Sequence, residues 1–382
     1  MHTDILIVGG GISGLTTAWQ LQQAGLNVCL IEARDRVGGR ILTREEATCD
    51  MGPSWYWPGQ PLIASLLEKL EIPSFEQNAQ GKVLWQDAQG HVQKYPMASP
   101  MAGALRIQGG TGALTQRIAT RISPKNLRLQ HVLKRLQIHG DGVRAKVQGP
   151  DGDLEILAKQ IALAIPPRVA GALSFTPELP ADVQTQLTST PTWMAGHAKF
   201  FALYDEPFWR ERGLCGTAMS QRGPLGEIHD ASPDTNDGYS LFGFVGWDSK
   251  TRTQLGETEL IAQITKQLVE IYGEQARALK KAFLQDWSTE PFTAGPDDQA
   301  QLRHHPRYGL NPELGEAWTG RLKFISSESS FTHGGLIEGA LEAAQNYAKT
   351  AIGSEACLPT LPVGPNPTAS FVSGCSGNLR LS

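Results

Sequence analysis

Residues 4–14 read Asp-Ile-Leu-Ile-Val-Gly-Gly-Gly-Ile-Ser-Gly, and this stretch decides the fold. The apolar run 5–8 predicts a buried strand, and the glycines follow where that strand would turn into a helix over about 15–23. A second apolar run, 28–31, ends at Glu32. Strand, G-x-G-x-x-G loop, helix, strand and acid in this order predict a Rossmann-like βαβ unit that binds a dinucleotide.

Each residue type in this unit has a physical reason. Gly9 allows the tight turn, Gly11 lets the backbone approach a pyrophosphate, and Gly14 lets helix and strand pack closely. The free N–H groups at the helix start attract phosphate. Glu32 can accept the ribose hydroxyls, and its charge would repel the 2′-phosphate of NADP. The predicted dinucleotide contacts in this unit are Gly9, Gly11, Ile12, Ser13, Gly14 and Glu32.

Two further segments favour FAD over NAD. Residues 32–40 read Glu-Ala-Arg-Asp-Arg-Val-Gly-Gly-Arg, and residues 50–55 read Asp-Met-Gly-Pro-Ser-Trp. A bare NAD site has no need of the second glycine pair. Both strings resemble the flavin amine oxidase family, which contains monoamine oxidase, polyamine oxidase and L-amino-acid oxidase. The resemblance implies FAD contacts at Ala33, Arg34, Gly39, Arg40, Gly52, Pro53, Ser54 and Trp55.

The resemblance continues along the chain. Segments 108–114 and 161–167 are similar to the family's mid-chain glycine loop and to a strand that closes the FAD-binding domain. Segments 324–328 and 334–340 are similar to its C-terminal flavin motif. The family implies that Val132 lies on the adenine side, that Glu328 contacts the FAD linker, and that a helix start faces the flavin. The further FAD contacts implied in this way are Val132, Trp287, Glu328, Leu336 and Ile337.

Lys199 is the candidate catalytic residue. In the predicted strand 196–204, alternation puts Lys199 on one face with Phe201 and Leu203, and a lysine among apolar neighbours is costly unless it has a partner or a task. Residues 206–209, Glu-Pro-Phe-Trp, match the family's continuation of this strand. The resemblance implies that Lys199 holds a water against flavin N5 and assists reoxidation by O₂. The competing interpretation is a lysine that reaches the surface.

The sequence departs from the family at the substrate side. Pro296 stands where covalently linked members carry a cysteine, so we expect non-covalent FAD. Asp297 and Leu336 stand where monoamine oxidases frame the amine between two tyrosines. No arginine follows Gly52-Pro53, where amino-acid oxidases present one to the substrate carboxylate. The residues expected to line the substrate pocket are Trp55, Tyr56, Phe292, Asp297 and Leu336.

The expected architecture is α/β. It combines a Rossmann-like FAD-binding domain, discontinuous in sequence, with a second, α+β substrate domain. A long amphipathic helix is expected over about 257–284, and the segment between Trp57 and Gly109 is short for the family, which implies a missing helical portion. The expected limits are 1–57, 106–180 and 300–352 for the FAD-binding domain, 58–105 and 181–299 for the substrate domain, and 353–382 for a loose tail.

Composition excludes several other classes of protein. The net charge is −4, from 34 basic and 38 acidic residues without a basic block, so nucleic-acid binding has no support. The five cysteines are scattered without a C-x-x-C pair, which favours a reducing compartment and gives no metal site. No apolar stretch approaches the ~18 residues of a membrane span. We therefore expect a cytoplasmic protein without a membrane anchor.

Three functions remain open. The favoured one is an FAD-dependent, amine-oxidase-like enzyme that takes hydride from a small-molecule amine to flavin N5 and passes electrons to O₂, giving hydrogen peroxide. The second is a desaturase or dehydrogenase of the same fold that acts on an apolar substrate. The third is a flavin-holding binding protein without turnover. Lys199 favours the oxidase, whereas the missing pair of tyrosines keeps the dehydrogenase open.

Overall fold

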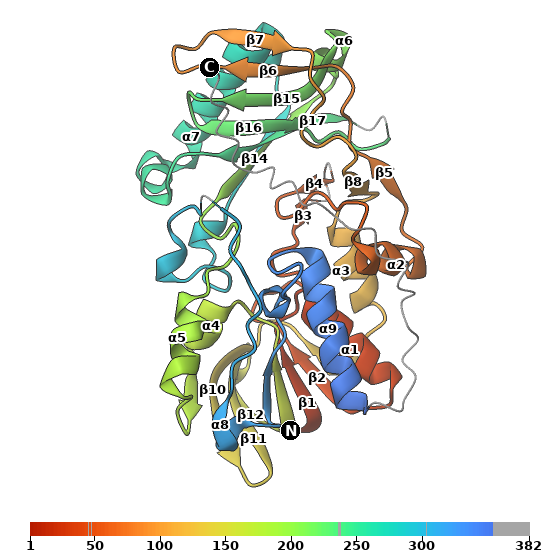
Figure 1. Ribbon diagram of the computed structural model, residues 1–382, viewed down its shortest axis with the longest axis vertical. Helices are drawn as coiled ribbons and strands as arrows, with labels where there is room; N and C mark the ends of the chain where they lie inside the picture. The colour runs from red at the N-terminus through yellow and green to blue at the C-terminus, as the bar shows by residue number, and fades with distance from the viewer. Residues whose placement is uncertain (45, 47, 236–237, 303, 354–382) are drawn as a thin grey trace.

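The chain is organised by two β-sheets, one in each of two lobes (Figure 1). The computed structural model describes residues 1–44, 46, 48–235, 238–302 and 304–353. The predicted tail therefore lies outside the described residues, except for Gly353. No helix in these ranges is both long and apolar enough to cross a membrane.

The first lobe contains the predicted βαβ unit. Strand β1 (His2–Val8) pairs in parallel with β2 (Val28–Ile31), and α1 (Ile12–Gln23) connects them. Strand β1 also pairs in parallel with β12, which places it inside the sheet. The remaining strands of this sheet are β9 (Leu127–Arg128), β10 (Val132–His139), β11 (Gly142–Gly149), β12 (Gly152–Leu163), β13 (Ser174–Thr176) and β19 (Leu322–Phe324).

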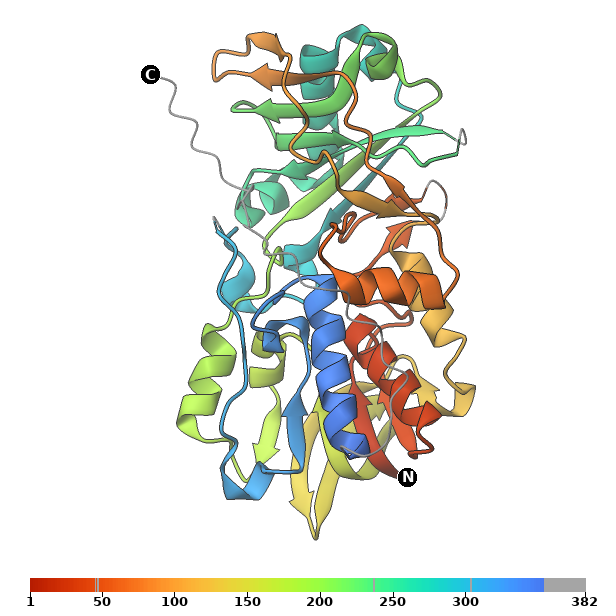
Figure 2. The same ribbon diagram turned by 45° about the vertical axis from the view of Figure 1, so that its right-hand side comes forward.

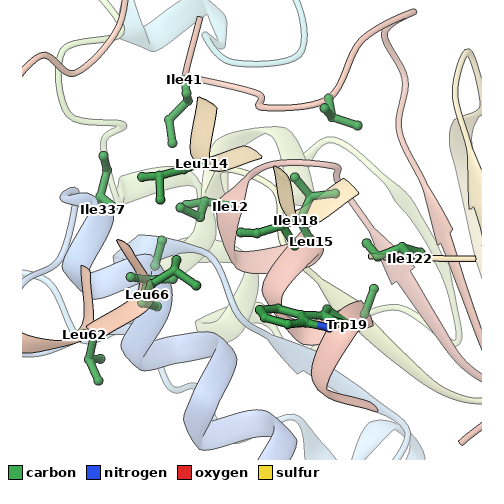
Figure 3. Close-up of a cluster of buried hydrophobic side chains, with 14 of the residues drawn as sticks. Ile12, Leu15, Trp19, Ile41, Leu62, Leu66, Leu114, Ile118, Ile122 and Ile337 are labelled. Atoms are coloured by element: carbon green, nitrogen blue, oxygen red, sulfur yellow. The ribbon is translucent and has the colours of Figure 1, made fainter. Parts of the chain in front are cut away.

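Helices cover both faces of this sheet (Figure 1). On one face α1, α2 (Pro61–Lys69), α3 (Gly112–Ala119) and α9 (Ile337–Ile352) enclose an apolar core. Figure 3 shows part of this core, in which Leu114 and Ile337 lie close to Ile12. The other face carries α4 (Pro167–Gly171), α5 (Ala181–Ser189) and α8 (Gly315–Trp318).

The second lobe is a sheet packed against α7 (Ser249–Tyr272). Its strands, in spatial order, are β18 (Lys281–Asp286), β14 (Ala198–Tyr204), β17 (Tyr239–Val245), β16 (Leu225–Asp230), β15 (Leu214–Ser220), β6 (Lys82–Gln86) and β7 (Val92–Tyr95). The short helix α6 (Phe208–Glu211) follows β14. Strand alternation makes one face of this sheet contact α7 and turns the other toward the first lobe (Figure 2).

The helix predicted over 257–284 is wrong at its C-terminal end. Helix α7 begins at Ser249, bends at Gly256 and stops before Gly273, whose φ of 91° lies in the left-handed region. Residues 281–286 instead form β18, which pairs with β14. In this segment the cross-strand pairing with β14 prevails over the helix expected from the sequence.

Small elements connect the lobes. Strands β3 (Thr43–Arg44) and β4 (Cys49–Asp50) form a hairpin below the second sheet, and β5 (Ser74–Glu76) pairs with β8 (Leu105–Ile107). Segment 58–105 contributes to both lobes, because α2 contacts α9 whereas β6 and β7 join the second sheet. The domain limits given above stay a prediction.

Candidate functional site

The glycine loop at the carboxyl end of β1 is shaped to admit a ligand. Gly9 has a φ of 107°, and a side chain on Gly14 would collide with the carbonyl oxygen of Gly9. Gly11 differs, because a Cβ there would find only the carbonyl oxygen of Gly38, at 3.9 Å. Helix α1 begins without a side-chain cap and without an acidic residue in its first turn. Its free N–H groups are therefore available to an anion, as a dinucleotide pyrophosphate requires.

Glu32 closes this loop from the neighbouring strand. Its side chain is buried, and its two oxygens accept the backbone N–H groups of Gly10 at 2.6 Å and Arg34 at 2.9 Å. A carboxylate has about four acceptor positions, so capacity remains for ribose hydroxyls. The N–H group of His131 donates to the carbonyl oxygen of Glu32, which brings Val132 at the start of β10 beside this site.

Arg40 lies beside the C-terminal motif. It makes a bidentate ion pair with Glu328, at 2.7 and 3.1 Å, and donates to the hydroxyl of Ser327 at 3.0 Å. Burial acts to raise the pKa of the fully buried Glu328, but the Arg40 guanidinium outweighs it and the pKa lies below its usual range. Arg40 itself keeps about a quarter of its side chain exposed (27%), so part of its charge faces open space where a phosphate could bind.

Lys199 extends from β14 into segment 50–54. Its Nζ donates to the carbonyl oxygens of Asp50 (2.6 Å) and Gly52 (2.9 Å) and contacts Ser54 Oγ at 2.6 Å. Burial lowers the pKa of Lys199 to about 7, although the Asp50 carboxylate acts in the opposite direction. These three contacts use every N–H of the ammonium. A water bound to Lys199 must therefore take the place of one of these partners.

Aromatic rings surround the Lys199 ammonium. Its Nζ lies 4.1 Å from the ring centroid of Phe242 and within 6 Å of the rings of Phe201 and Phe244. Trp55 packs on Phe242 with 5.1 Å between ring centroids. Ring faces carry partial negative charge, so they support a cation in a site that excludes water.

A hydrogen bond from Trp287 links the second lobe to segment 50–54. Its indole N–H donates to the carbonyl oxygen of Met51 at 2.9 Å, and the ring is buried. The segment is held equally closely from the first lobe, since a side chain on Gly52 would collide with the carbonyl oxygen of Arg40. Residues 50–54 are therefore fixed between Arg40 and Lys199.

Comparison with known proteins identifies the family to which this chain belongs. The model of the flavin containing amine oxidoreductases matches residues 12–101 and 89–352. The chain belongs to this family. AofH of Mycobacterium tuberculosis, which carries the name of a flavin-containing monoamine oxidase, is 26% identical over 90% of this chain and 95% of its own length. An L-amino acid dehydrogenase of Synechocystis is 23% identical over 92% of this chain and 95% of its own length.

The family's fold is shared as well. A putrescine oxidase, solved with putrescine bound, superposes with a TM-score of 0.77 at 22% identity, covering 92% of this chain and 99% of the other. The predicted fold class is thereby confirmed. Because the chain belongs to the flavin containing amine oxidoreductases, the protein is a flavin-dependent oxidoreductase of the amine oxidase type. The alignment with AofH runs over 448 positions, 66 more than the 382 residues of this chain, so AofH contains residues that have no counterpart here.

Within this amine oxidase fold, the residues predicted to line the pocket lie in different surroundings. Trp55 packs near Lys199, but Tyr56 belongs to the core of the first lobe and donates its hydroxyl to Ser74 at 2.8 Å. Phe292 lies under the Arg34 guanidinium, 5.5 Å from its ring centroid. Asp297 is exposed, and its carbonyl oxygen accepts from Arg168. Trp55 approaches Lys199 through Phe242, whose ring it packs on and which lies over the Lys199 ammonium.

The two residues at the start of α9 lie where predicted for a helix start. Leu336 is its N-cap, and Ile337 opens the helix in the core of the first lobe. Glu338, in the first turn, accepts the N–H groups of Leu62 and Ile63, both at 2.9 Å. Glu338 thus uses its charge to cap α2.

Sequence reasoning missed two features of the site. Asp50 is buried, and its Oδ1 accepts from Thr43 at 2.5 Å and from Thr111 at 2.8 and 2.9 Å. Burial raises the pKa of Asp50, although these hydrogen bonds act to lower it. The second feature is an ion pair between the lobes, in which Arg34 binds Glu290 at 2.9 Å. Asp50 could have been found in the sequence, as the first residue of Asp-x-Gly-x-Ser-Trp. The ion pair could not, because it joins positions 256 residues apart.

Proposed function

We propose that this protein is an FAD-dependent amine oxidase, which oxidises the C–N bond of a small-molecule amine and passes the electrons to O₂ to give hydrogen peroxide. The observation that carries the proposal is the buried amine of Lys199, with a pKa near 7, held against the segment that follows the FAD-binding motifs. A flavin bound there would accept hydride from the substrate carbon and later reduce oxygen.

The residues for FAD binding fit that cofactor. The open side of Gly11 and the uncapped start of α1 would hold the pyrophosphate, Glu32 the ribose, and Arg40 a phosphate. We propose that the FAD is non-covalent, because Pro296, at the family's linkage position, has no nucleophilic atom to form the bond. Acid precipitation of the purified protein should release FAD into the supernatant. Flavin that stays with the precipitate would refute non-covalent binding, and FMN or NAD in the supernatant would refute FAD.

Lys199 would act through its charge and its proton. With a pKa of about 7, its amine is protonated in part at neutral pH and can donate a proton as well as stabilise developing negative charge. Phe242 and Trp55 exclude water from this place, which strengthens both effects. The amine class of substrate is supported by the family and by the solved relative that binds putrescine.

The proposal is tested by mixing the purified protein with a panel of amines and amino acids without oxygen. Bleaching of the flavin by an amine, followed by hydrogen peroxide when air enters, is the expected result. Absence of bleaching with every compound would overturn the proposal and support a flavin-holding binding protein.

One observation favours a second function, a dehydrogenase that passes electrons to an acceptor other than oxygen. All three N–H groups of Lys199 are taken by Asp50, Gly52 and Ser54, which leaves none for a water. The relative from Synechocystis is also named a dehydrogenase. Bleaching by an amine or an apolar substrate, with slow return of colour in air and fast return with a dye, would establish this alternative.

A further inference from the structure

The sheet face that carries Lys199 also carries a carboxylate. In strands β18, β14, β17 and β16, the residues Gln285, Lys199, Phe244 and Glu227 are direct cross-strand neighbours. Directly opposed residues of antiparallel strands point to the same face of a sheet. Glu227 therefore shares the face of Lys199, two strand spacings or about 10 Å away between Cα atoms.

Glu227 is held by a buried histidine. The Nε2 of His229 lies 2.6 Å from Glu227 Oε1, and the ring is fully buried against Trp55 and Phe242, with centroids 5.0 and 5.4 Å away. Its Nδ1 is buried without a hydrogen-bond partner among the described residues. An imidazolium would leave a charged N–H unpaired there, whereas a neutral ring leaves only an acceptor. The unpaired Nδ1 is therefore assigned as the acceptor, and Nε2 as the donor to the Glu227 carboxylate.

Glu227 differs from two other carboxylates of this sheet. Asp230, at the end of the same strand β16, and Asp286, at the end of β18, are each paired with an arginine, Arg210 and Arg252 respectively. Within the described ranges, Glu227 has no lysine or arginine partner. Its side chain keeps 25% of its surface exposed, and the partly exposed Phe244 lies between it and Lys199. At its β16 end the face thus offers a negative charge beside an aromatic surface, and Lys199, the cation on the same face, lies two strands away.

We propose that Glu227, positioned by His229, binds a second cationic group of the substrate, so that the enzyme prefers amines with an additional ammonium over monoamines. The inference rests on the proposed function, because it places the reacting amine on the Lys199 side of Phe244 and the distal ammonium at Glu227. The ligand class is a diamine or a longer polyamine.

The test compares 1,5-diaminopentane with pentylamine, which has the same length and lacks the second charge. Glu227→Gln should lower the ratio of kcat/KM for diamine over monoamine by about ten- to a hundredfold, the scale of one hydrogen bond to a charged group. His229→Phe keeps a ring but frees the carboxylate, and should raise the KM for the diamine more than it changes kcat. FAD content measured on each variant reports whether it is folded.

The matched control is Glu274→Gln, which removes the same charge from an exposed position in the same lobe and should leave the ratio unchanged. Charge reversal gives the converse result. Glu227→Lys should shift the preference from the diamine to 5-aminopentanoate, which carries a carboxylate in place of the second ammonium. If amines bleach the flavin but both Glu227 variants keep the wild-type ratio, this inference is wrong and the proposed function stands. If no amine bleaches the wild type, both fall.

Discussion

Lys199 is the residue whose role differs between the proposed oxidase and the alternative dehydrogenase. Its Nζ contacts Asp50, Gly52 and Ser54, so the side chain both carries a charge and fastens segment 50–54. Lys199→Met keeps length and apolar volume but removes charge and donor. Reoxidation of the reduced flavin by O₂ should slow by about a hundredfold, the effect of losing one preorganised electrostatic contact of roughly 3 kcal/mol. Reduction by the amine should slow less, and stopped-flow absorbance measures the two half-reactions separately.

Lys281→Met is the matched control. Lys281 lies on the adjacent strand β18 and is half-exposed, so the same substitution removes a charge from the same sheet without emptying a buried position. Both rate constants should stay near those of the wild type in this variant. A Lys199→Met protein that reoxidises as fast as the wild type would show that Lys199 only fastens segment 50–54.

The buried amine also predicts how stability depends on pH. The pKa of Lys199 falls from 10.5 to about 7 on folding, so the unfolded chain binds more protons between these values. The free energy of unfolding should therefore rise with pH across this window, by at most about 1.4 kcal/mol per pH unit from this group. Urea denaturation of wild type and Lys199→Met at pH 7 and 9 measures it. Equal pH dependence in the two proteins would contradict the buried position.

At the scale of elements, the β1–α1 unit gives a contrast between two glycines. Gly14→Ala should lower the free energy of unfolding by about 1–3 kcal/mol, because its methyl group meets the carbonyl oxygen of Gly9. Gly11 has an ordinary φ of −71°, and a Cβ there would meet open space. In Gly11→Ala the free energy of unfolding of the FAD-free protein should therefore change by less than about 0.5 kcal/mol.

The same methyl group at Gly11 would occupy the approach of the pyrophosphate, so FAD affinity should fall at least about tenfold. Thermal unfolding of the FAD-free proteins and titration with FAD, followed by flavin fluorescence, separate the two effects. Gly11→Ala that binds FAD as tightly as the wild type would show that the cofactor does not pass over this glycine.

The elements also show what sequence can predict. The βαβ unit was predictable because its glycines, apolar runs and Glu32 lie within 30 residues and each has a local reason. Helix α7 was misjudged at its end because β18 forms by pairing with the distant β14, which no local pattern reveals. The position of Tyr56 in the core of the first lobe could not be predicted for a related reason. It follows Trp55 directly, and in extended backbone neighbouring side chains point to opposite sides.

At the scale of the whole molecule, the site is assembled where the two lobes meet (Figures 1 and 2). Contacts between distant positions hold it, namely Arg34 with Glu290, and Trp287 with Met51. The cofactor motifs could be predicted because they lie in continuous segments. The surroundings of Phe292 and Asp297 could not, because they depend on how the lobes pack. The pair Glu227 and His229 was likewise hidden, because only the sheet register aligns it with Lys199.

The proposed reaction cycle consists of reduction of the flavin by an amine and its reoxidation by oxygen. The most direct measurement follows amine consumption, oxygen consumption and hydrogen peroxide together in a sealed cell with catalytic amounts of the purified protein. We predict that one oxygen disappears and one hydrogen peroxide forms for every amine oxidised. Amine oxidised only when an artificial acceptor is present, with no oxygen consumed, would contradict the oxidase and identify a dehydrogenase.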